Sequence, residues 1–406
     1  MTGHCTEAFF PAFANPADEV DAVPRLLQRP FLRLFVAGPF WLAVFFLLSG
    51  YVCALKPLRL FREGRIDDGR RAIEGGAFRR VPRLVIPTTA ATVLIWILNK
   101  LGAFKAAQNA GSDWLRRTVP PDEAVTGLIK NCVHRVKGRS NQKFNTWARS
   151  ENRYEAIQWT LGFEMRGSML LFIGLLATAS CTPTARTVLL FSLIAYFYEA
   201  GDLLSGFLFY SGALLADVSL CIPETKKRWP IALTILALFF GSYPNEPERA
   251  AYSRFLKTVF DRYITVSGGM SQKKPLTLGE THRTIAAIAS ILLVISILLN
   301  ASLQHLLSHR LLVFLGSVSF PLYLLHGTFM RTVLAWAYYS VHAEWQAAVI
   351  FVLWASVLLA ACYVWRKTVD EFALLVSRRA EEIASGKAGI SFGDFLSHRK
   401  KHLDRV

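Results

Sequence analysis

The chain has 406 residues, of which 53% are hydrophobic and 18% are charged, and its formal net charge is +17. A soluble globular domain is typically about 45–50% apolar and about 25% charged, so this composition argues against a soluble protein. Lys and Arg cluster in loops between apolar runs. We therefore attribute the positive net charge to membrane topology and to contact with anionic lipid. We therefore expect a lipid bilayer and no nucleic acid as a partner.

Residues 1–34 contain four prolines and no apolar run long enough to cross a membrane. We therefore predict that they form a separate amino-terminal segment. Nine apolar runs follow, continuous rather than alternating, which favours helices over a barrel. The fold class predicted is all-α: a polytopic transmembrane helix bundle of about nine spans over residues 35–366, followed by a basic cytoplasmic tail over 367–406. The predicted spans are Phe35 to Leu55, Leu84 to Leu101, Trp159 to Ser180, Thr187 to Tyr198, Leu203 to Leu220, Ile231 to Tyr243, Ile285 to Asn300, Leu311 to Trp336, with a bend expected at Pro321, and Ala347 to Trp365.

The loop from Lys56 to Arg83 fixes the predicted orientation. It is rich in arginine, and short loops of this kind face the cytoplasm. The amino terminus is then outside and the carboxyl terminus inside a multi-pass membrane protein. Two long polar loops, Gly102 to Ile157 and Pro244 to Arg283, fall on the outer side. Because loops vary and carry function, we expect them to govern specificity.

Two charged residues interrupt the apolar run from Gln158 to Ala177. Glu164 and Arg166 lie inside it, although a charge at the centre of a spanning helix costs roughly 2.5–3.5 kcal/mol. Such residues normally face a bundle interior or a polar cavity, which makes both candidates for the site. The alternative places them near the membrane surface, at the mouth of a site.

His326 is the other polar candidate within a predicted span. An imidazole can act as general base toward a hydroxyl group. The alternative is a histidine that only satisfies the packing between two helices. No metal site is expected, because His305 and His309 lack the glutamate of a zinc-binding helix, and the six cysteines show no paired spacing.

Four phrases resemble the acyltransferase 3 family, and its fungal branch in particular. They are F-F-L-L-S-G-Y-V (Phe45 to Val52), R-R-V-P-R-L-V-I-P (Arg79 to Pro87), W-T-L-G-F-E-M-R-G-S-M (Trp159 to Met169) and G-S-V-S-F-P-L-Y-L-L-H-G (Gly316 to Gly327). The resemblance implies an integral-membrane enzyme that transfers an acyl group, often acetyl, from acyl-CoA as co-substrate. The implied acceptor is a hydroxyl group of a carbohydrate or small metabolite, and no permanently bound cofactor is implied.

The resemblance also implies roles for particular residues. Arg80 and Arg83 would bind the phosphates of the acyl-CoA donor from the cytosol. Glu164 would orient or tune the catalytic base, and Arg166 would stabilise developing negative charge or hold the acceptor.

The catalytic base in the family is a histidine near the end of a first helix, and this chain begins too late for that helix. The matching residue is His4, just before T-E-A-F-F-P (Thr6 to Pro11). The sequence therefore predicts His4 as base if a helix holds it, and His326 otherwise. Two other readings stay open: a transporter or permease with these residues along its pathway, and a catalytically dead, truncated homologue.

Overall fold

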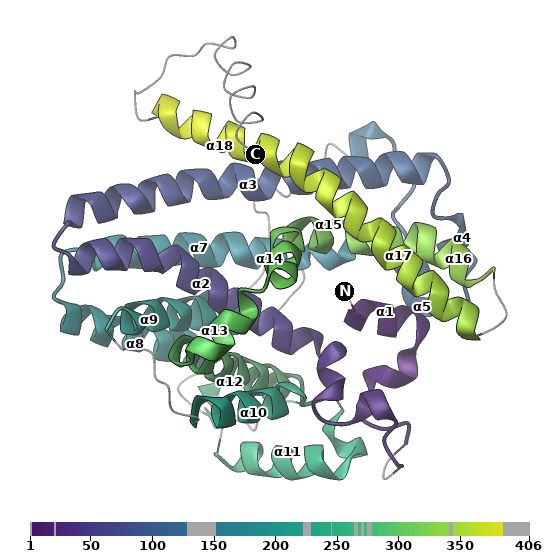
Figure 1. Cartoon of the computed structure of the whole chain (residues 1–406), viewed down its shortest axis with the longest axis horizontal. Coiled ribbons are helices and arrows are strands. Elements are labelled where there is room, and N and C mark those ends of the chain that lie inside the picture. The colour runs from purple at the N-terminus through teal and green to yellow at the C-terminus, as the bar shows by residue number, and fades with distance from the viewer. Residues whose placement is uncertain are drawn as a thin grey trace.

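The computed structural model of the chain describes residues 2–19, 22–127, 152–221, 229–244, 246–263, 267–268, 272–273, 278–340 and 344–384. These residues are almost entirely helical or in short connections (Figure 1). A two-residue hairpin, which pairs β1 (Ser267–Gly268) antiparallel to β2 (Gln272–Lys273), is the exception within the described part. The predicted all-helical class is confirmed.

Five helices are long and apolar enough to cross a membrane, and a sixth qualifies if a bent pair counts as one span. The five are α2 (Gly38–Arg62), α3 (Ile66–Lys100), α7 (Thr160–Ala177) with η4 (Ala156–Trp159), α12 (Leu278–Leu299), and α17 (Glu344–Trp365) with its continuation through η9 (Arg366–Asp370) and α18 (Glu371–Ala384). Two further apolar helices in the described chain are shorter. The described residues thus contain five or six candidate spans, whereas the number nine stays a prediction.

The remaining elements connect or flank these helices. They are α1 (Thr2–Phe9), η1 (Pro11–Ala14), η2 (Leu26–Gln28), η3 (Leu32–Phe35), α4 (Lys105–Gln108), α5 (Asp113–Arg117), α8 (Pro183–Glu199), η5 (Leu203–Leu208), α9 (Phe209–Ser219), α10 (Trp229–Gly241), η6 (Pro247–Arg249), α11 (Ala251–Tyr263), α13 (Ala301–Leu307), α14 (Arg310–Ser317), α15 (Ser319–Phe329), η8 (Met330–Leu334) and α16 (Ala335–Tyr338).

The helices extend further than hydropathy indicates. α2 and α3 are separated only by residues 63–65, so most of the predicted basic loop from Lys56 to Arg83 is helical. The reason is that Arg, Lys and Glu are good helix formers, and hydropathy marks the apolar part of a helix rather than its ends. The helix after α17 likewise continues through Ala384, past the expected start of the tail.

The predicted span from Leu311 to Trp336 is broken. α14 and α15 meet at an angle of 64°. The break falls just before Ser319, close to Pro321, where the sequence predicted a bend. It turns the start of α15 toward the interior of the protein.

Helix α2 is at the centre of the larger of two helical groups, which also contains α3, α7, α9, α10 and α12. It packs against α9 with backbone nearly in contact. A Cβ atom placed on Gly50 would lie 2.2 Å from the carbonyl oxygen of Phe209, and one on Gly212 would lie 2.1 Å from that of Leu47. Small residues allow such close packing between membrane helices.

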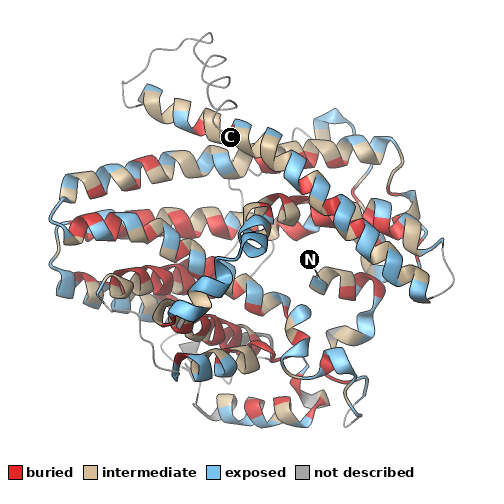
Figure 2. Ribbon diagram, viewed as in Figure 1, coloured by how far each residue is buried: buried red, intermediate tan, exposed pale blue. Residues whose placement is uncertain are grey.

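The second group is built around α15, η8 and α17. Its buried side chains include Leu324, Met330 and Leu358, and the short helix α1 packs into the same core through Phe9. Figure 1 shows α1 and α17 toward one end of the molecule, whereas α3, α7 and α2 start together at the other end and α3 runs along most of its length. Buried side chains lie along the inner faces of both groups (Figure 2).

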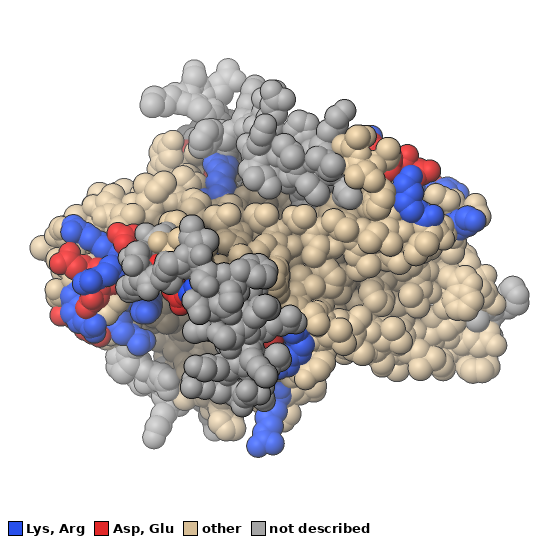
Figure 3. Space-filling view, turned by 90° about the horizontal axis from the view of Figure 1, so that it is seen from above, with Lys and Arg blue, Asp and Glu red and all other residues tan. Residues whose placement is uncertain are grey.

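The surface agrees with a membrane protein. Seen from above, charged side chains gather at one end of the molecule and at an opposite corner, with a few more Lys or Arg side chains elsewhere on the edges, and a broad surface of uncharged residues is visible between them (Figure 3). Many large apolar side chains are exposed there and elsewhere, such as Val352 and Trp336 at 67% and 68%. An apolar surface of this extent is expected of helices that face lipid.

Candidate active site

A cavity of about 1130 Å³ lies between the two helical groups. Its wall is formed by residues of α1, α2, α3, α7 and α15, together with η9 and α18. Five of the six predicted site residues line it, far apart in sequence but gathered in one space: His4, Arg80, Arg83, Glu164 and His326. Arg166 does not line it.

His326 lies on α15 with its ring fully enclosed. Its Nδ1 atom is 2.9 Å from the carbonyl oxygen of Leu322 and 3.0 Å from that of Tyr323. A carbonyl oxygen only accepts hydrogen bonds, so Nδ1 carries the proton and Nε2 of the neutral ring is the acceptor. Nε2 is buried and has no hydrogen-bond partner among the described residues. It is therefore available to a hydroxyl group in the cavity.

His4 meets His326 at this end of the cavity. The two rings are stacked, with centroids 5.6 Å apart and an interplanar angle of 22°, and the ring of Trp114 lies 5.8 Å from that of His4. The Nδ1 atom of His4 is 3.4 Å from Oε2 of Glu7. A carboxylate at Nδ1 favours the tautomer whose Nε2 can accept a proton, the arrangement of histidine bases in general. The condition that a helix holds His4 is met.

Packing fixes α1 in this position. The side chain of Thr2 hydrogen bonds to the carbonyl oxygen of Phe35, and the ring of Phe9 packs edge-on against Tyr338 at 4.9 Å. Cys5 is on the same helix, with its sulfur 3.6 Å from that of Met330. Burial raises the pKa of the Cys5 thiol to about 11, so this neighbour of His4 stays protonated at neutral pH and is a poor nucleophile.

Glu164 is buried, at 3% exposure, and pairs with Arg80 rather than with a histidine. Its Oε1 atom accepts a hydrogen bond from the guanidinium group of Arg80. Its Oε2 atom is buried and has no hydrogen-bond partner in the described part of the chain. The structure thus leaves a second acceptor atom at the cavity wall, and no hydrogen bond within the described residues joins Glu164 to His4 or His326.

Arg166 corrects the expectation that both charges of α7 face one site. Its guanidinium group is 2.8 Å from Oδ2 of Asp202, whose side chain is 5% exposed. Asp202 in turn accepts a hydrogen bond from the amide of Ser205 at the start of η5. Arg166 therefore ties α7 to η5 and does not reach the cavity.

The two arginines that were predicted to bind the donor, Arg80 and Arg83, differ in their ion pairing. Arg80 is paired with Glu164, whereas Arg83 has no carboxylate within 4 Å among the described residues. Both line the cavity, and Arg83 is near enough to Asp370 of η9 to interact with it electrostatically. Arg83 is thus the better placed of the two to bind an incoming phosphate.

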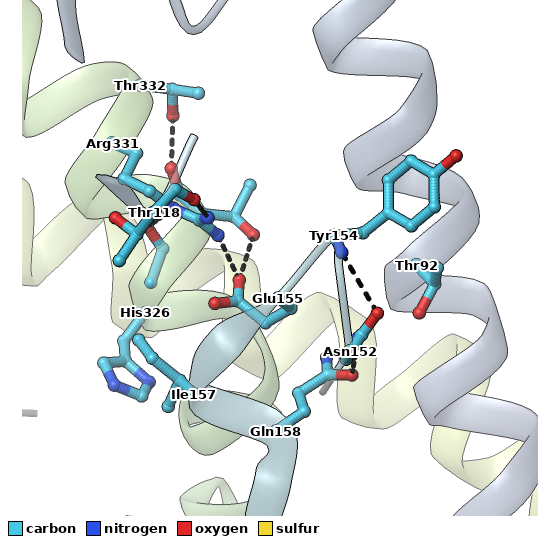
Figure 4. Close-up of polar contacts among 12 residues, drawn as sticks. Thr92, Thr118, Asn152, Tyr154, Glu155, Ile157, Gln158, His326, Arg331 and Thr332 are labelled. Carbon is cyan, nitrogen blue, oxygen red and sulfur yellow. Dashed lines mark hydrogen bonds and ion pairs between the residues drawn. The ribbon is translucent and has the colours of Figure 1, made fainter. Parts of the chain in front are cut away.

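A buried ion pair that the sequence did not predict supports the histidine end (Figure 4). Arg331 and Glu155 have side chains 0% and 1% exposed and contact each other directly. Arg331 also donates to the carbonyl oxygens of Thr118 and Gly327, and Thr328 donates to Glu155. The pair joins three segments that surround His326.

Sequence reasoning had one signal for this pair. Arg331 lies inside the predicted span from Leu311 to Trp336, so the rule that selected Glu164 also applies to it. Glu155 lies in a predicted loop and gave no signal. Tyr323 adds a second link between the same segments, since its hydroxyl donates to the carbonyl oxygen of Ile157 and lies 2.7 Å from the hydroxyl of Thr160.

The rest of the polar residues have structural roles. Asp217, fully buried, accepts a hydrogen bond of 2.7 Å from Arg62. Within the described residues no group of three or more His, Cys, Asp or Glu side chains is arranged to hold a metal ion.

Comparison with known proteins gives a consistent picture. The family described as an acyltransferase domain matches residues 1–365. The chain is 25% identical to the O-acetyltransferase PaAT-1 of Phomopsis amygdali over 331 residues, a match that covers 75% of this chain and 65% of that protein. The chain thus spans slightly less than two thirds of that relative.

Two further relatives are somewhat more distant. The chain is 23% identical to the acyltransferase R4 of a Phoma species over 347 residues and to the acyltransferase clz18 of Cochliobolus lunatus over 348 residues. Each match covers 74% of this chain, and they cover 69% and 70% of those proteins. No solved structure gives a significant match.

Proposed function

The chain belongs to the acyltransferase domain family, and on that premise we propose that it is a membrane-bound O-acyltransferase. It moves an acyl group, acetyl in the simplest case, from acyl-CoA to a hydroxyl group of a small metabolite or carbohydrate, in secondary metabolism. The observation that carries this proposal is the composition of the cavity wall, which combines two stacked histidines with the guanidinium groups of Arg80 and Arg83.

The histidine end supplies the base. His4 takes the proton of the acceptor hydroxyl on Nε2, while Glu7 holds the proton on Nδ1 and stabilises the imidazolium that forms. Nε2 of His326 accepts a hydrogen bond from the acceptor and so orients it beside His4. Glu164 Oε2 can bind a second hydroxyl group of the acceptor.

The reaction proceeds by direct transfer. The acceptor oxygen attacks the thioester carbonyl carbon, the new C–O bond forms and the C–S bond breaks. CoA leaves as a thiolate and takes the proton from the imidazolium of His4. Arg83 binds a phosphate of the donor. The cavity, at about 1130 Å³, is large enough for a small acceptor together with the acyl end of the donor.

The test is acceptor-dependent release of free CoA. Membranes that contain the chain are incubated with acetyl-CoA, with and without a panel of hydroxylated small molecules, and free thiol is measured. We expect release that needs an acceptor, and a loss of about 100-fold or more in His4→Gln, the size typical of a general base.

The matched control is His309→Gln. His309 is exposed at the start of α14 and does not line the cavity, so this variant should keep full activity. Undiminished activity in His4→Gln would refute the role of His4. Absence of release with every acceptor would refute the proposed activity and favour a catalytically inactive homologue or a transporter.

A further inference from the structure

The wall of the cavity includes a segment beyond the region that matches the family. The match ends at residue 365, and the next residue begins η9. Arg366, Asp370, Ala373 and Leu374 of η9 and α18 all line the cavity. Their spacing of four, seven and eight residues from Arg366 puts them on one helix face. This face is turned toward the cavity.

Contacts with α3 hold the segment in place. Figure 1 shows α18 running alongside α3. Arg79 donates a hydrogen bond of 2.6 Å to Glu381 of α18, and a Cβ atom on Gly75 would lie 2.3 Å from the carboxylate of Glu381. Ser377, fully buried, faces the same interface. α18 is therefore a fixed part of the wall rather than a loosely attached tail.

The segment brings a second arginine to the end of the cavity where Arg83 lies. Arg366 donates a hydrogen bond of 3.1 Å to the hydroxyl of Ser317, beside the break between α14 and α15. Neither Arg83 nor Arg366 has a carboxylate within 4 Å among the described residues, although Asp370 is near enough to interact electrostatically with both. Two guanidinium groups thus face one space with a single nearby carboxylate.

We propose that Arg366, together with Arg83, binds the phosphate groups of the acyl-CoA donor, so that the segment after residue 365 completes the nucleotide end of the site. This inference rests on the proposed function. Guanidinium groups are planar, permanently charged and suited to two parallel hydrogen bonds with a phosphate. The Oδ1 atom of Asp370, buried and without a hydrogen-bond partner among the described residues, is an acceptor for an N–H group of the donor.

The experiment compares two donors with the full chain in membranes. Acetyl-CoA carries the nucleotide and its phosphates, whereas S-acetylpantetheine has the same reacting thioester without them. For Arg366→Ala we expect the KM for acetyl-CoA to rise about tenfold or more, since a hydrogen bond to a charged group is lost. The kcat should stay within about twofold of the original, and kinetics with S-acetylpantetheine should not change.

Lys367→Ala is the matched control. Lys367 lies on the same π-helical turn, pairs with Glu371 at 3.4 Å and does not line the cavity, so both donors should be used as before. Arg366→Lys keeps the charge without the planar fork and should give a smaller rise in KM than Arg366→Ala.

Three outcomes would overturn the inference. Equal losses with both donors would show that Arg366 acts on structure or chemistry rather than on the nucleotide. Unchanged kinetics with both donors would show no contact. If the unmodified chain transfers the acyl group from neither donor, the proposed function fails. The nucleotide site is then tested separately by the binding of free CoA to the purified chain. Binding that weakens in Arg366→Ala supports the site, and binding that does not weaken overturns it.

Discussion

The ion pair between Arg331 and Glu155 allows a quantitative test of how the histidine end is held. Both side chains are fully buried, and the pair joins η8, which continues α15 beyond His326, to the residue just before η4. In Arg331→Met the charge of Glu155 would remain buried, and among the described residues only the hydroxyl of Thr328 would donate to it, 3.2 Å away. Removing one partner of a buried pair costs about 3–5 kcal/mol, because the other charge is left uncompensated.

The double variant Arg331→Met/Glu155→Leu separates charge from packing. With both charges gone, the remaining loss is that of the hydrogen bonds to two carbonyl oxygens, about 1 kcal/mol each. We therefore expect the double variant to be more stable than either single variant. The measurement is the unfolding free energy, or the thermal midpoint, of the purified protein in detergent.

An exposed pair serves as the control for this prediction. The Nη2 atom of Arg25 is 2.7 Å from Oδ2 of Asp18, a short distance for an ion pair, but the two side chains are 56% and 38% exposed. Surface pairs contribute about 0–1 kcal/mol, so Arg25→Met should barely change the stability. If the double variant at 331 and 155 lost the sum of the two single losses, the charges would not be coupled and the reasoning would be refuted.

Three further predictions concern other contacts. Glu164→Gln should lower acyl transfer by about tenfold or more, the loss expected for one hydrogen bond to a charged group, measured as CoA release per amount of folded protein; full activity would refute its place in the site. Gly50→Val should cost about 1–3 kcal/mol of stability, because its side chain would overlap the backbone of α9, whereas Gly38→Ala, with open space around it, should not. Asp202→Asn should lower the thermal midpoint, by about 1–2 kcal/mol of stability since Arg166 is partly exposed.

The helical fold could be predicted because apolar runs report directly on burial in lipid or protein. The ends of helices could not, since the sequence from Lys56 to Arg83 is polar and yet almost wholly helical. The break between α14 and α15 was predictable only as a bend near Pro321, because its direction depends on packing.

The site was predictable to the extent that it uses charge or polarity within an apolar run. This rule selected Glu164 and His326, and the family resemblance selected His4. Neither signal showed that the rings of His4 and His326 stack, or that Glu155 pairs with Arg331, 176 positions away. Contacts of such sequence separation are set by the packing of whole helices, and one chain contains no local trace of them.

The division between Glu164 and Arg166 follows from helix geometry. An α-helix turns by about 100° per residue, so side chains two positions apart point about 200° from each other. Both could not face the same cavity once α7 was helical through this region, as it is. The two side chains therefore point to different places. Arg166 binds Asp202 and so fixes the rotation of α7 about its axis. That rotation directs Glu164 toward the cavity. A charge next to a site in sequence can thus serve the site by holding its helix in place.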